Sequence, residues 1–267
     1  MMPPRPTTQK NSVYFTVLAA LAKHGCPVCR IMEEASASYL DTLFYEQVTD
    51  VGVRRKLRRA RGLCNWHSWQ ARRITNAALG ISIIAKDLIE EECTRLAAFE
   101  PRSFWRRLAD LIQARLPRRA PPAYLREWRA RAVCPVCQVA VEHEQHALET
   151  VLTFVDEGAF SRHFEASTGL CLPHTARATE QAPSHPKLGL FIDLQRSNYT
   201  RLVAELEEFC RKHDYRFARE GWGREADAWQ RAIETLSGNS GVFGSAIERQ
   251  HAARRPRLVR KLLNRWR

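Results

Sequence analysis

One pattern of cysteine and histidine occurs twice in this chain and limits what the chain can fold into. The tetrapeptide CPVC stands at 26–29 and again at 134–137. A Cys-x-x-His pair follows each copy, in GLCNWH at 62–67 and in GLCLPH at 169–174. The two motifs therefore recur at almost the same offset, which differs between them by a single position. This spacing predicts a tandem duplication of one unit.

Each unit offers three thiols and one imidazole, which is a ligand set for a tetrahedral metal ion. Two thiols close together in the chain can turn toward one centre, and a Cys-x-x-His pair completes four ligands that suit zinc. Two full sets in otherwise diverged copies are hard to explain as eight independent core residues. The predicted metal ligands are Cys26, Cys29, Cys64 and His67 in the first unit and Cys134, Cys137, Cys171 and His174 in the second.

The pairing of these half-sites is open at this point. The chain between each CPVC and the next Cys-x-x-His pair covers 30–63 in the first unit and 138–170 in the second. Two helices fit in such a spacer and could return the chain to its first pair, so we favour pairing within each unit. Both half-sites then lie at helix N-termini, where free N–H groups stabilise thiolates. Pairing across the units, with the two copies packed as a swapped pair, is the alternative.

Three other chemistries compete with a structural zinc site. An iron–sulfur cluster for electron transfer or redox sensing normally takes four Cys ligands but accepts His in place of some. Thiol–disulfide exchange at CPVC would need a strand–helix–strand pattern, which we do not find. A catalytic zinc keeps one position open for water, whereas four ligands fill it here. We therefore expect a structural or binding module, and no set of residues names an enzymatic reaction.

Helical periodicity runs through both units. Apolar residues recur at helical spacing over 31–48 and over 139–155. No convincing alternation of apolar and polar residues indicates a strand. We expect an all-α fold with further helices at 12–24, 66–79, 82–99, 187–213 and 225–236. In this interpretation Asn11 or Ser12 caps the first helix, and Ser184 caps the helix from 187.

The apolar stretch VYFTVLAALA at 13–22 raises the question of a signal peptide or a membrane span. It is about half the length that a membrane-spanning helix needs. The residues after it, KHGC at 23–26, offer no cleavage site, so we interpret the stretch as the first helix, stopped by Gly25. We expect a cytoplasmic protein without a transmembrane segment, in which eight cysteines would not form four disulfides.

The repeats and the composition between them predict the domain organisation. A linker rich in arginine and proline separates the two units, and a glycine–serine joint, SGNSG, precedes a basic tail. The predicted parts are a first metal-binding repeat at 12–100, the linker at 101–122, a second repeat at 123–215, a C-terminal helix and flexible joint at 216–248, and the tail at 249–267.

The net charge of +13 is distributed in clusters. RRKLRRAR at 54–61 carries six positive charges, and the tail at 249–267 carries eight and no acid. Such clusters can bind nucleic acid or an anionic membrane surface, although 35 of the 42 basic residues are arginine, which genome composition can also explain. The candidate anion-binding residues are Arg54, Arg55, Lys56, Arg58, Arg59, Arg254, Arg255, Arg257, Arg260 and Lys261.

The remaining cysteines, histidines and tryptophans carry weaker signals. Cys93 and Cys210 follow acidic pairs on long helices, and we expect them to be small buried apolar residues. His143 and His146 have no third ligand in view, so we expect a solvated helix face. Trp66 and Trp69 flank the first histidine and are expected to shield its site from water. In KHDYRF at 212–217, ion pairs at a helix end are the simplest interpretation.

The order of these motifs resembles a known protein family. The paired CPVC…GLCxxH units, the long helix that runs into KHDYRF and the helix with glutamate and tryptophan after it are similar to a bacterial family classed as a domain of unknown function. The resemblance covers about 20–238, and all eight predicted ligands fit its motifs. It implies the tandem metal-binding unit and brings no activity with it. The arginine-rich tail after 248 lies outside the shared pattern.

Overall fold

A computed structural model describes residues 9–98, 123–217 and 219–243. In these residues the chain forms eleven α-helices and two short 3-10 helices, and no strand. The expected all-α fold is therefore confirmed. In the described part of the chain, no helix combines the length and the apolar character that crossing a membrane requires. The predicted linker at 101–122 and the predicted basic tail at 249–267 both lie outside the described residues.

The chain divides into two compact units. Unit 1 comprises Met1–Ser38 and Gln138–Arg267, and unit 2 comprises Tyr39–Cys137. Each unit therefore combines residues of both predicted repeats. The repeats, their boundaries and the duplication that they imply remain predictions from the sequence.

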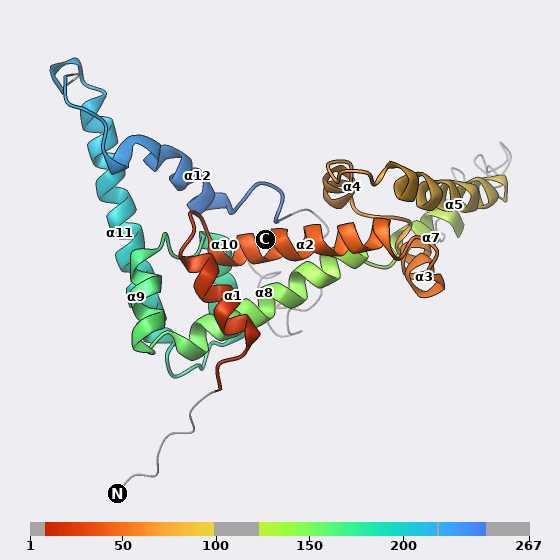
Figure 1. Cartoon of the computed structure of the whole chain (residues 1–267), viewed down its shortest axis with the longest axis horizontal. Helices are drawn as coiled ribbons and strands as arrows, with labels where there is room; N and C mark the ends of the chain where they lie inside the picture. Colours follow the sequence, from red (N-terminus) through yellow and green to blue (C-terminus); the bar gives the residue numbers. More distant parts are fainter. Residues whose placement is uncertain (1–8, 99–122, 218, 244–267) are drawn as a thin grey trace, which may run out of the picture. The chain divides into compact units, whose positions relative to one another are not determined.

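Unit 1 is built around the long helix α11. This helix runs alongside α9 and then alongside α12 (Figure 1). The helices of unit 1 are α1 (Ser12–Leu21), the first part of α2 (Pro27–Tyr45), most of α8 (Pro135–Phe154), α9 (Gly158–Ala166), α10 (Leu172–Gln181), α11 (Leu188–Lys212) and α12 (Ala228–Ser237). Short 3-10 turns lie at Tyr215–Phe217 and Arg224–Asp227.

Helix α1 is fixed to unit 1 by Tyr14, which is only 2% exposed. Asn11 caps α1 by accepting the Tyr14 N–H at 3.0 Å, as the sequence predicted. The Tyr14 ring packs edge-on against Phe154, and its hydroxyl donates to Glu157 at 2.9 Å. Glu157 in turn caps α9 by accepting the N–H of Phe160. The bonds from Tyr14 and Phe160 lower the pKa of Glu157 to about 2, so its carboxylate stays ionised in this role.

Unit 2 contains four helices of its own. They are α3 (Val51–Ala60), α4 (Asn65–Ala71), α5 (Ala78–Ala97) and α7 (Ala123–Arg129), and they are joined by the end of α2 and the start of α8. Asp50 caps α3, and α3 ends where Arg61 takes a left-handed conformation at φ 55°. Gly80 lets α5 approach the end of α2 closely, because a β-carbon there would collide with the carbonyl oxygen of Phe44.

Several predicted boundaries differ from the structure. The predicted helix at 66–79 ends at Ala71, and a turn through Asn76 at φ 62° separates it from α5. Helices α3, α7, α9 and α10 had no predicted range of their own, because each has at most ten residues and α3 is mostly basic. Ser184 does not cap α11, which begins at Leu188 after Lys187 without a side-chain cap.

Candidate metal sites

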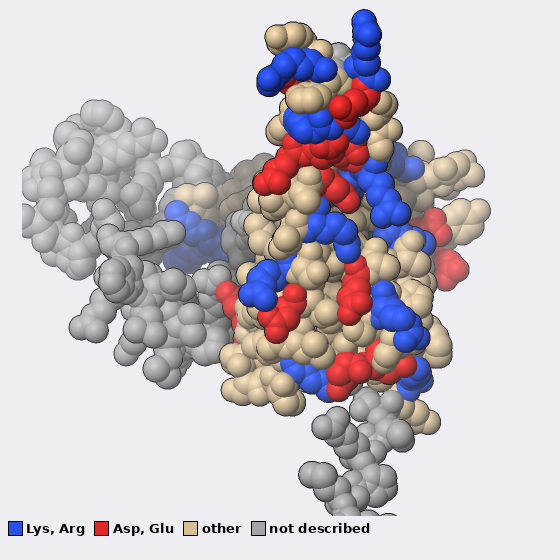
Figure 2. All heavy atoms as spheres, turned by 90° about the vertical axis from the view of Figure 1, so that its left-hand side faces the viewer, with Lys and Arg blue, Asp and Glu red and all other residues tan. Residues whose placement is uncertain are grey.

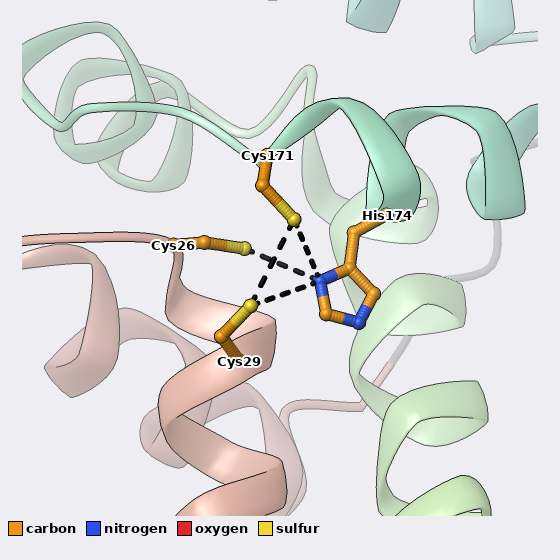
Figure 3. A group of neighbouring side chains, drawn as sticks. All are labelled: Cys26, Cys29, Cys171 and His174. Carbon is orange, nitrogen blue, oxygen red and sulfur yellow. Dashed lines mark hydrogen bonds between the residues drawn. The ribbon is translucent and has the colours of Figure 1, made fainter. Parts of the chain in front are cut away.

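Site 1 lies in unit 1, where the starts of α2 and α10 meet (Figure 3). Cys26 precedes α2, and Cys29 lies in its first turn. Cys171 is the N-cap residue of α10, and His174 lies in the first turn of that helix. All four side chains are buried.

The ligand atoms of site 1 have the spacing of a small coordination tetrahedron. Nδ1 of His174 lies 3.4 Å from the sulfurs of Cys26 and Cys29 and 3.2 Å from that of Cys171. The sulfurs of Cys29 and Cys171 are 3.8 Å apart. A zinc ion with sulfur ligands at about 2.3 Å and nitrogen at about 2.0 Å gives edges of about 3.8 Å between sulfurs and about 3.5 Å between sulfur and nitrogen. The donor set therefore fits a single tetrahedral ion.

Site 2 lies in unit 2 and repeats this arrangement with the other half-sites. Cys64 is the N-cap residue of α4, followed by His67, while Cys134 and Cys137 stand at the start of α8. Nδ1 of His67 lies 3.2, 3.6 and 3.3 Å from the sulfurs of Cys64, Cys134 and Cys137. Three ligands are buried, but Cys64 is partly exposed. The ligand atoms of each site lie within 4.8 Å of one another, so each group can hold a metal ion.

The pairing that we favoured from the sequence is wrong, because each site combines half-sites from both predicted repeats. Helix length explains the correction. Helix α2 has 19 residues and α3 has 10; at 1.5 Å per residue these helices are about 28 Å and about 15 Å long. The second helix is too short to return the chain to the start of the first. The same holds for α8 with 20 residues and α9 with 9.

The electrostatics of both sites favour positive charge beside the sulfurs. Burial raises the pKa of the Cys26 thiol, but hydrogen bonds from Cys171 and Cys29 hold it well below its usual range. The pKa of the Cys29 thiol is raised, because its hydrogen bonds with Cys171 and Cys26 and its burial oppose its ionisation. In site 2 burial lowers the pKa of His67, yet bonds with the sulfurs around it raise it to about 9. None of the eight cysteines forms a disulfide, and a divalent ion would remove the repulsion between thiolates.

A buried amide on α11 holds the loop that presents Cys171. Gln195 is 1% exposed; its Oε1 accepts the N–H of Leu170 at 2.8 Å, and its Nε2 donates to the carbonyl of Leu170 at 3.1 Å. The Tyr199 hydroxyl donates to the same carbonyl at 3.0 Å. Gly169 has φ 71°, and a β-carbon there would lie 2.7 Å from Gln195 Nε2. Sequence reasoning missed Gln195, which no motif marks.

A buried carboxylate stands behind the histidine of site 1. Glu144 on α8 and His174 are both fully buried, and Oε1 of Glu144 lies 3.4 Å from Nε2 of His174. Met32 Sδ lies 3.3 Å from the same nitrogen. Since Nδ1 faces the three sulfurs, the carboxylate can fix the imidazole with Nδ1 toward a bound ion, as carboxylates that hydrogen-bond a metal-binding histidine do. Glu144 lies between His143 and His146 in the sequence. No motif marks it there, and only its burial in the structure sets it apart from the exposed acidic residues of α8.

The remaining cysteines, tryptophans and histidines differ in how well they match their predictions. Cys93 and Cys210 are exposed, so their predicted burial is wrong. Cys93 lies nine residues after buried Ile84, which places it on the opposite side of α5. Trp69 is 54% exposed and does not seal site 2. His143 and His146 are exposed, as expected.

Ion pairs within unit 2 already neutralise part of the predicted basic cluster on α3. Arg54 and Arg58 both bond Asp87 on α5, at 3.0 and 2.9 Å. These two arginines lower the pKa of Asp87. Arg55, Lys56 and Arg59 are exposed to solvent. The other five candidates, Arg254, Arg255, Arg257, Arg260 and Lys261, lie outside the described residues.

On unit 1, basic and acidic side chains alternate over the face that carries α11 (Figure 2). Ion pairs explain this pattern, since Arg211 bonds Glu208 at 2.7 Å and Arg231 bonds Asp227 at 2.8 Å. Asp214 and Arg216 pair at 2.7 Å just beyond the end of α11, as the interpretation of KHDYRF predicted. This face therefore offers no continuous basic surface among the described residues.

Comparisons with known proteins place the chain in a family. Neither the curated proteins nor the solved structures gave a match. A family model, described as a family of unknown function (DUF6062), matches residues 15–242, which include all eight cysteine and histidine residues of the two sites. The resemblance drawn from the paired motifs is thereby confirmed, and the chain belongs to the DUF6062 family of unknown function.

Proposed function

We propose that this protein is a zinc-binding helical module with two structural Cys3His sites. One observation carries the proposal: in each unit, three sulfurs and one imidazole nitrogen converge at the spacing of a zinc tetrahedron. The residues of each site come from two helix starts that are far apart in the sequence. A metal ion would therefore tie distant segments together and couple metal binding to folding.

The compactness of the ligand groups favours a single ion over an iron–sulfur cluster. In a cluster different irons hold different ligands, so the cluster itself keeps those ligands apart. Here the four ligand atoms of each site lie within 4.8 Å of one another, the size of one ion's coordination shell. Three thiolates and one imidazole suit zinc among the common divalent ions. The iron–sulfur alternative is the second outcome of the test below.

The closed ligand sets support a structural role. Four protein ligands fill a tetrahedral shell and leave no position for water or substrate. When bound, zinc would link the two helix starts of each site through their thiolates and imidazole. In site 1, Glu144 would hold His174 in place. Cysteines without disulfides are typical of proteins from a reducing compartment, which supports a cytoplasmic location. The nucleic-acid alternative loses support because Arg54 and Arg58 are already paired with an acid.

Elemental analysis of protein purified without oxygen, together with a visible spectrum, tests this proposal. We expect about two zinc per chain and no colour. Cys29→Ser and Cys137→Ser should each reduce the content to about one. The double variant Cys93→Ser/Cys210→Ser is the matched control, because both residues are exposed and lie outside the sites, and it should keep both metals. Iron with acid-labile sulfide, or no metal at all, would overturn the proposal.

A further inference from the structure

The residues that follow α12 lie directly on site 1. The backbone N–H of Asn239 donates to the sulfur of Cys29 at 3.4 Å. The Phe243 ring packs against His174, with ring centroids 4.7 Å apart. Val242 is only 4% exposed. We call residues 238–243 the cover segment, because it contacts two of the four ligands of site 1.

The cover segment is anchored by specific contacts. Gly238 has φ 78°, and a β-carbon there would collide with the Phe243 ring and lie 3.3 Å from the sulfur of Cys29. The side chain of Asn239 donates to Glu33 on α2 at 3.0 Å, which ties the segment to the helix that carries Cys29. The sequence predicted a flexible joint at 237–241 from its glycine and serine content. Gly238 allows the chain to pass close to the site.

These contacts have a chemical consequence for a bound metal. An N–H that donates to a metal-bound thiolate stabilises its negative charge and so holds the sulfur as a ligand. An aromatic ring over the imidazole excludes water and incoming ligands. A metal in a closed four-coordinate site leaves most readily when a competing ligand reaches the ion. A cover of this kind should therefore slow metal loss.

Site 2 has a different environment. Within the described residues, the backbone N–H that reaches a sulfur of site 2 belongs to His67, itself a ligand, at 3.5 Å from Cys64. Cys64 is partly exposed, whereas all four ligands of site 1 are buried. Trp69, next to this site in the sequence, is half exposed. A competing ligand can therefore approach site 2 through Cys64.

We propose that the cover segment makes the metal of site 1 slow to exchange, so that site 2 exchanges its metal first. This inference rests on the proposed function and assigns a different role to each of the two sites. Site 1 holds a permanent metal that maintains unit 1. Site 2 holds an exchangeable metal that small thiol or chelating ligands can remove. Asn239 and Phe243 are positioning residues, since they act through the ligands Cys29 and His174.

Metal release into an excess of EDTA, followed by native mass spectrometry, tests the inference on the full chain. We expect wild-type protein to lose one zinc at least ten times faster than the other. Cys64→Ser should remove the fast phase and thereby assign it to site 2. Phe243→Ala should speed the slow phase at least tenfold and leave the fast phase unchanged. Tyr215→Ala, at an 86% exposed aromatic residue, is the matched control and should change neither phase.

A second variant and a measurement on wild-type protein test the contacts of the cover segment independently of Phe243. Asn239→Pro removes the N–H donor to Cys29 and should also speed the slow phase, with unchanged helicity in the metal-loaded state. Hydrogen exchange of the loaded wild-type chain should show protected amides at 239 and 242. One common release rate, an unchanged slow phase in folded Phe243→Ala, or unprotected amides would overturn the inference. Protein that contains no metal would instead refute the proposed function.

Discussion

The two candidate metal sites have the same residue types in the same motifs but differ in what surrounds them. In site 1 every ligand is buried, a carboxylate stands behind the histidine, and residues 238–243 cover one side. In site 2 Cys64 is partly exposed. The motif therefore specifies the set of possible ligands, whereas the elements packed around it decide how well a bound metal would be protected.

The loops that present Cys171 and Cys64 show the same contrast in detail. Each loop has a glycine in the left-handed conformation, Gly169 at φ 71° and Gly62 at φ 97°. The two glycines are 107 positions apart in the sequence, and so are Gln195 and Leu88. Gln195 contacts the loop at Gly169, and Leu88 contacts the loop at Gly62. Gln195 holds its loop by hydrogen bonds, while the Leu88 side chain lies 3.5 Å from where a β-carbon on Gly62 would be. The same turn can thus be held by polar or apolar contacts.

Loss of a ligand should have the largest effect and should separate the two sites. We expect Cys171→Ser to release one metal and lower the free energy of unfolding by on the order of 4 kcal/mol, because it leaves charged groups unpaired in a buried site. Cys64→Ser should also release one metal but cost about half as much, since water reaches that ligand. Urea unfolding followed by circular dichroism measures both values. Equal losses in the free energy of unfolding would show that the difference in burial between the two sites does not affect stability.

Alanine in place of the two loop glycines tests the second difference. Both substitutions carry the left-handed strain of about 1–2 kcal/mol. Gly169→Ala must in addition displace Gln195, whose bonds hold the loop, so we expect a total cost of about 3 kcal/mol or more. Gly62→Ala meets only an ordinary contact with Leu88. Thermal unfolding of the metal-loaded variants measures the difference, and a Gly62→Ala variant at least as unstable as Gly169→Ala would contradict it.

The smallest of the three effects concerns the carboxylate behind His174. Glu144→Gln should weaken zinc binding at site 1 about tenfold or more, because the amide orients the imidazole less firmly. Site 2 should keep its affinity. Competition with a chelating dye, in a Cys64→Ser background that retains only site 1, measures the change. Glu142→Gln, exposed on the same helix, is the control, and equal affinities for both variants would remove Glu144 from this role.

Local features of the fold followed from local sequence signals. Asn11 caps the first helix as predicted, and periodicity located α2, α8 and α11 because each carries a long apolar stripe. Helices α3, α7, α9 and α10 were not predicted, since none of them has enough apolar positions for a clear period. The burial of Glu144 and Gln195 could not be predicted either, because it depends on helices packed against them from elsewhere in the chain.

The sequence by itself determined the all-helical class and the eight cysteine and histidine residues that gather into two groups of four. Residue type and close spacing define a half-site without reference to the rest of the chain. Only the tertiary structure decided the pairing, which joins Cys26 and Cys29 to Cys171 and His174. Helices α2 and α8 are each about twice as long as the helix that follows them. A half-site therefore meets the partner that helix packing brings to it, and not the one that follows it in the chain.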